Sequence, residues 1–114
     1  MHLKMEVCMN TEVSIHHHDY PSGMRLLVEE KMNGLVRFCS GVVSMKARLE
    51  RQAGAHRVEI IATVPHGPVL VADARADGVR GALDEALERM ARKLKRSREL
   101  QTRERRRSSR HLDA

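Results

Sequence analysis

The chain has 114 residues, which suffices for one domain but not for two independent hydrophobic cores. It holds 21 Lys and Arg against 15 Asp and Glu, and the excess is local, because residues 89–114 contain 11 of the basic and only 3 of the acidic residues. A domain with one strongly positive end is typical of polyanion binders, whether of nucleic acid or of an anionic membrane, and a catalytic domain joined to a regulatory domain is not expected.

In chain order, apolar and polar residues first alternate along residues 3–15, which predicts one long strand or two short ones. Residues 23–38 then carry apolar side chains at helical spacing, which predicts an amphipathic helix. Alternation returns in residues 43–50, 57–64 and 69–76, separated by short turn sequences. These three segments predict an antiparallel meander.

The clearest helical pattern begins at Val79 and keeps its apolar spacing as far as Leu94. Its polar face begins acidic and becomes basic from Arg89 onward, which suits the helix dipole. Beyond Leu100 apolar residues almost disappear, so residues 101–114 are expected to form a basic, largely disordered tail.

The order of these elements predicts an α+β fold, a β-α-β-β-β-α two-layer sandwich with two helices on one face of a four-stranded sheet. Double-stranded RNA-binding domains use the same layout, which raises the expectation of RNA binding. Residues 9–100 would form this domain, and residues 1–8 are either an N-terminal extension that lengthens the first strand or the product of a misassigned start. Residues 101–114 would follow as the tail.

Two stretches also resemble a known family. Residues 13–38 contain MRLLVEEKMNGLVRF, with an arginine at Arg25 and a basic residue at Lys31 in the family's positions, and residues 82–96 read ALDEALERMARKLKR. Over residues 9–98 the chain resembles a short ribosome hibernation promoting factor. That family also includes ribosome-associated inhibitor A and the sigma-54 modulation proteins. Its long members carry a C-terminal dimerisation domain, and this sequence is expected to be a short form without it.

The resemblance implies a factor that docks on small-subunit rRNA in the decoding region, where it occludes mRNA and the A- and P-site tRNAs and inhibits translation by idle ribosomes. It implies binding as a monomer. Carried over by position, the rRNA contacts would be Lys31, Arg37, Arg89, Arg92, Lys93, Arg96 and Arg98. The sequence departs from the family at Arg80, where a tyrosine is usual, and at Gly78, where an aspartate is common.

Further basic residues extend this set. Lys95 lies on the same helix, and the tail contributes Arg103, Arg105, Arg106 and Arg107 as a weaker electrostatic anchor to RNA. The alternative is a solvated helix face followed by an inert tail. Since the only aromatic residues are one Tyr and one Phe, recognition is expected to use phosphates and RNA shape rather than base stacking.

The remaining chemistry points away from an enzyme. The sequence has no Gly-rich phosphate loop, zinc-spaced cysteine pair or nucleophile elbow, so we expect no catalysis, cofactor or small-molecule substrate. His16, His17 and His18 are adjacent and would point to alternate sides of an extended segment, so they form a loop, solvated or near RNA, rather than a metal site. Cys39 is expected to be a small core residue, and Cys8 and Cys39 to be reduced thiols in the cytoplasm.

Two other functions stay open at this stage. One is a protein-interaction regulator like a sigma-54 modulator, and the other is a generic double-stranded RNA-binding module. Phosphate binding would weaken steeply with salt, whereas an apolar protein interface would not. Apolar runs are only a few residues long, so no membrane partner is expected. Pairing of two copies through a strand edge at residues 1–7 also stays open.

Overall fold

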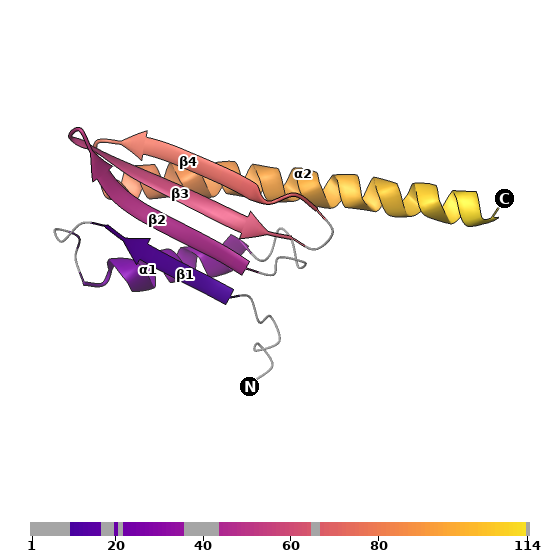
Figure 1. The fold of residues 1–114 in the computed structure, drawn as a ribbon, viewed down its shortest axis with the longest axis horizontal. Helices are drawn as coiled ribbons and strands as arrows, with labels where there is room; N and C mark the ends of the chain where they lie inside the picture. Colours follow the sequence, from indigo (N-terminus) through magenta and orange to yellow (C-terminus); the bar gives the residue numbers. More distant parts are fainter. Residues whose placement is uncertain (1–9, 17–19, 21, 36–43, 65–66, 114) are drawn as a thin grey trace.

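The computed structural model describes residues 10–16, 20, 22–35, 44–64 and 67–113. Its elements are, in chain order, β1 (Asn10–Ile15), α1 (Met24–Gly34), β2 (Ser44–Gln52), β3 (Ala55–Thr63), β4 (Leu70–Ala76) and α2 (Val79–Asp113). The four strands form one sheet, and both helices lie on the same side of it (Figure 1). The predicted α+β sandwich is confirmed, while the predictions for residues 1–8, His17, His18, Arg37 and Cys39 lie outside the described residues.

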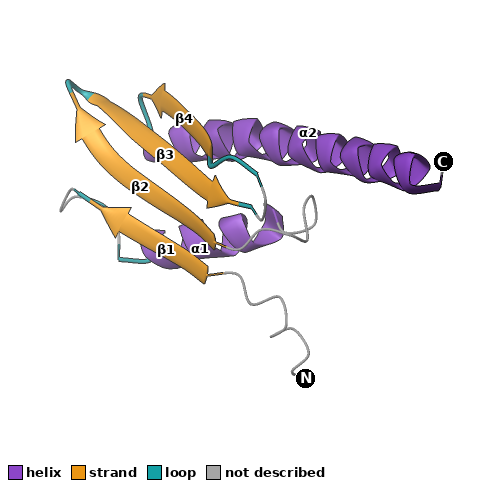
Figure 2. Ribbon diagram, turned by 45° about the vertical axis from the view of Figure 1, so that its right-hand side comes forward, coloured by secondary structure: helices purple, strands orange, loops and turns teal. Residues whose placement is uncertain are grey.

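The sheet is mixed and has the strand order β1-β2-β3-β4. β2, β3 and β4 form the predicted antiparallel meander, whereas β1 pairs with β2 in parallel, so that α1 is the crossover between two neighbouring parallel strands (Figure 2). β2 and β3 are joined by Ala53 and Gly54, both with positive φ (48° and 80°), the conformation of a two-residue type I′ hairpin turn. β1 and β4 are therefore the two edge strands.

The apolar and polar residues that alternate along the strands lie on opposite faces of the sheet. Val13, Ala47, Ile60 and Ala72 stand in one row across the four strands, and all of them are buried beneath the helices. Polar and charged side chains occupy most of the positions between such rows and face away from the helices. The sheet consequently has one core face and one open face.

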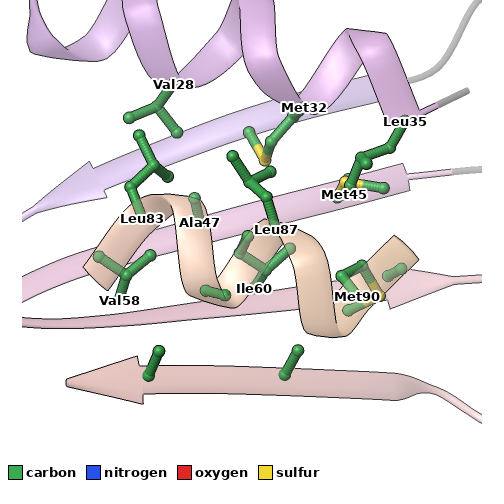
Figure 3. Packing of buried hydrophobic residues seen from close by; sticks show 14 of the residues in the cluster. Val28, Met32, Leu35, Met45, Ala47, Val58, Ile60, Leu83, Leu87 and Met90 are labelled. Carbon is green, nitrogen blue, oxygen red and sulfur yellow. The ribbon is translucent and has the colours of Figure 1, made fainter. Parts of the chain in front are cut away.

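The core lies between this face and the two helices (Figure 3). α1 packs against β1 and buries Met24, Val28 and Met32, at the i, i+4, i+8 spacing of one helix face. α2 packs against β3 and β4, and Leu83 reaches toward Val28 from the opposite helix (Figure 3). This packing fixes which side of α2 remains exposed.

The end of α2 differs from the prediction. A disordered tail was expected from residue 101, but the helix continues through Asp113. Gln, Arg and Glu are strong helix formers, and no Gly or Pro follows Leu94. Adding residues to an existing helix also avoids the cost of nucleation. The apolar face that residues 101–113 lack is needed only for packing against another element, and a projecting helix can form without it.

Candidate nucleic-acid interface

α2 presents the largest set of cations in the described chain. Its apolar face ends at Leu94, the last fully buried residue of the helix, and the 19 residues of 95–113 continue beyond the sheet (Figure 1). At 1.5 Å per residue, this projecting segment is about 28 Å long. From residue 89 onward, the exposed basic side chains along the described part of the helix are Arg89, Arg92, Lys93, Lys95, Arg96, Arg98 and Arg103, and Arg80 is exposed in the first turn.

Two of these cations lie against the outer edge of the sheet. Arg89 donates from Nη1 to the backbone oxygen of Asp73 at 2.6 Å, and Lys93 donates from Nζ to the backbone oxygen of Val71 at 2.6 Å. Arg89 also forms an ion pair with Glu85, one helical turn earlier, at 2.5 Å. Because β4 is an edge strand, these carbonyls have no strand on that side, and the two side chains satisfy them.

Two further cations form exposed ion pairs. Arg92 lies 3.5 Å from Glu88 on the same helix, and Lys31 of α1 lies 3.3 Å from Asp84 of α2. The Arg92 side chain is 72% exposed, so water competes for its charge. Such surface pairs contribute little free energy, and a phosphate can replace the carboxylate at small cost.

The cations of the projecting segment form a group of their own. The side chains of Lys95, Arg96, Arg98 and Arg103 make no hydrogen bond or ion pair with another described residue. We call these four residues the unpaired cations, and all of them follow Leu94 on the projecting segment. Arg96 and Arg103 are about two turns apart on one side of the helix. A polyanion could bind here without breaking an existing contact among the described residues.

The open face of the sheet carries a balanced network instead. Its charged residues are four cations and four anions, namely Lys46, Arg48, Arg57, Arg75, Glu12, Glu50, Glu59 and Asp73. Arg57 lies at the centre, 2.9 Å from Glu50, 3.3 Å from Glu59 and 3.1 Å from Asp73. The hydrogen bond with Glu50 is the main reason why the pKa of Arg57 is raised. This neutral face leaves the positive charge on α2.

The described aromatic residue does not offer a stacking surface. Tyr20 is partly buried, and its hydroxyl lies 2.8 Å from Nδ1 of His56. The two rings are tilted by 40° at a centroid distance of 5.4 Å. Burial is the main reason why the pKa of Tyr20 is raised. Tyr20 therefore serves packing, in keeping with recognition through phosphates rather than bases.

The structure describes only part of the predicted histidine loop and of the arginines near the C-terminus. His16 is exposed, and no group of three metal-ligating side chains occurs among the described residues. The backbone of residues 105–107 belongs to α2, but the side chains of Arg105, Arg106 and Arg107 are outside the described part. None of the described helices has an apolar stretch long enough to cross a bilayer.

Comparison with known proteins identifies the family. The sigma 54 modulation protein / S30EA ribosomal protein family matches residues 11–102. The chain belongs to this family. The match ends inside α2, so the last turns of the helix, to Asp113, lie beyond the part that the family model covers.

Two solved structures share the fold. The Protein Y N-terminal domain of Thermus thermophilus has a TM-score of 0.68 and 25% sequence identity, over 77% of this chain and 98% of that one. A ribosomal subunit interface protein from Coxiella burnetii also has a TM-score of 0.68, with 18% identity over 79% of this chain and 98% of that one. No curated protein sequence matches the chain. The family resemblance drawn from the two sequence stretches is confirmed.

Proposed function

We propose that the chain is a non-catalytic ribosome-binding factor that docks on rRNA of the small subunit in the decoding region. There it occludes mRNA and the A- and P-site tRNAs, and so inhibits translation by idle ribosomes in the cytoplasm. It binds as a monomer. The observation that carries this proposal is the exposed basic face of α2 in a chain of the S30EA ribosomal protein family.

The chemistry of this face supports RNA phosphate as its ligand. Arginine and lysine recognise phosphate oxygens by charge-assisted hydrogen bonds, and binding releases counterions from the nucleic acid. The unpaired cations can engage phosphates directly, while Lys31 and Arg92 must first exchange a carboxylate partner. We therefore assign the first contacts to the projecting segment of α2. Arg37 and the arginines of residues 105–107 remain proposed contacts.

The test is co-sedimentation of the purified chain with separated small and large ribosomal subunits at a low and a moderate salt concentration. The same preparation is added to an in vitro translation reaction. The proposal predicts binding to the small subunit that weakens steeply with salt, together with reduced translation. Absence of binding to the small subunit at low salt would refute it.

Two outcomes would assign the chain to a different class. Equal binding to free RNA duplexes and to the small subunit would indicate a generic double-stranded RNA-binding module. Binding to a protein partner with little dependence on salt would indicate a protein-interaction regulator. The charge on α2 favours the ribosome proposal over the latter, because apolar interfaces are depleted of charged residues at their centre.

A further inference from the structure

Both edges of the sheet are covered by cations from the helices. On β1, Arg25 of α1 donates a hydrogen bond to the backbone oxygen of Val13. On β4, Arg89 and Lys93 of α2 donate to two backbone oxygens that are two residues apart along the strand. Proteins commonly protect exposed edge strands with charged side chains, because an unprotected edge can pair with a strand of another molecule.

The β4 edge is the one that most needs this protection. Val69, just before the strand, is 58% exposed, and Val71 within it is 41% exposed. Both are β-branched residues that favour strand structure. The carbonyls of Val71 and Asp73 are the acceptors that a neighbouring strand would use, and the side chains of Lys93 and Arg89 occupy that space. The Val71 and Asp73 carbonyls of this edge strand are therefore already satisfied by side chains of the same chain.

The sequence of β4 is complementary to itself. In an antiparallel pair of two copies centred on Ala74, Asp73 of each copy stands opposite Arg75 of the other, on the same face of the joined sheet. Opposite charges in such cross-strand positions are stabilising. In the register centred on Asp73, two aspartates would instead oppose each other, which is unfavourable. The charges thus favour the pairing centred on Ala74 over the one centred on Asp73.

We infer that the outer edge of β4 is a strand-pairing surface for a second copy of this chain, and that Arg89 and Lys93 keep it closed. The two side chains act by occupying the outer carbonyls. They also place positive charge where the α2 helices of two copies would approach each other. The inference concerns the protein alone and does not depend on ribosome binding.

The test compares two double variants that remove the same charge from the same helix at the same spacing. In Arg89→Ala with Lys93→Ala, the β4 carbonyls are uncovered, whereas in Arg92→Ala with Arg96→Ala they stay covered. Light scattering across a concentration series measures the mass, starting from 13.0 kDa for one copy. The first variant is expected to approach twice this mass, with self-association at least about tenfold tighter than in the unmodified chain and the control.

A mass of one copy for the first variant at every concentration would overturn the inference, and so would equal self-association of both variants. The pairing surface itself is tested by adding Asp73→Arg to the first variant, which sets a cation opposite Arg75 of the other copy and should restore the single-copy mass. A dimer that persists would show that β4 is not the interface. If the double variant does not fold by circular dichroism, Lys93→Ala alone uncovers the Val71 carbonyl, and unchanged mass there would also contradict the inference.

Discussion

Replacement of three unpaired cations by glutamine should weaken ribosome binding without loss of stability. The variant carries Lys95→Gln, Arg96→Gln and Arg98→Gln, which lie on the projecting segment of α2. Since these exposed side chains have no partner among the described residues, the free energy of unfolding should change by less than about 0.5 kcal/mol. The effect on binding is then a direct measure of phosphate contact.

The expected magnitude follows from counterion release. Each lost phosphate contact lowers the slope of log K against log salt by about 0.7 to 0.9, so three contacts lower it by about 2 to 3. For a slope difference of about 2.4, raising the salt from 50 to 200 mM should weaken the binding of the unmodified chain about 30-fold more than it weakens the binding of the variant. The unmodified chain should therefore show a much steeper salt dependence than the variant.

The assay is a titration of labelled small subunits at four or more salt concentrations. The matched control is Lys46→Gln, Arg48→Gln and Arg75→Gln, which removes the same charge from exposed positions on the open face of the sheet. Its slope should stay close to that of the unmodified chain. An unchanged slope for the α2 variant, or an equal loss in the control, would refute the assignment of the phosphate contacts to α2.

Other predictions concern the fold. Arg57→Ala should destabilise the protein by about 1–3 kcal/mol in chemical denaturation, because it removes the cation that three clustered carboxylates share. Arg75→Ala, the matched control on the same face, should cost less than about 0.5 kcal/mol, and an equal loss in both variants would contradict the central role of Arg57. Tyr20 is the only tyrosine, so ultraviolet titration should give a pKa above 10.0 in the folded protein and an ordinary value after denaturation. Because the folded pKa is raised, stability should fall as the pH rises through and above about 10, and a pH-independent denaturation midpoint there would contradict this. Ala53→Gly should raise stability by about 0.5–1 kcal/mol, since Ala53 has a positive φ of 48° that glycine adopts without strain, and a destabilised variant would contradict the hairpin geometry.

The layers of the fold were predictable because burial is one-sided. Met45, Ala47 and Leu49 alternate with exposed residues since only one face of β2 meets the helices. The parallel pairing of β1 with β2 was not predictable in the same way, because alternation has the same period in parallel and antiparallel strands. That pairing depends on the crossover through α1, which is a tertiary arrangement.

The basic face of α2 was also predictable. Its division into cations that contact the β4 edge and cations that project beyond the sheet was not. The spacing of Arg89 and Lys93 places them on one side of the helix, yet it carries no information about which backbone lies beside that side. The structure shows these two cations on the β4 edge and the unpaired cations beyond the sheet. In the sequence, both groups belong to one uninterrupted basic run.

In the proposed binding mode, the chain and tRNA would occupy the same place on the small subunit. The most direct measurement is a competition in which labelled chain is bound to small subunits, and mRNA with a matching P-site tRNA is then added in increasing amounts. We expect that tRNA displaces the chain, and that the chain in excess displaces tRNA. Simultaneous binding of both, at full occupancy on the same subunit, would contradict it.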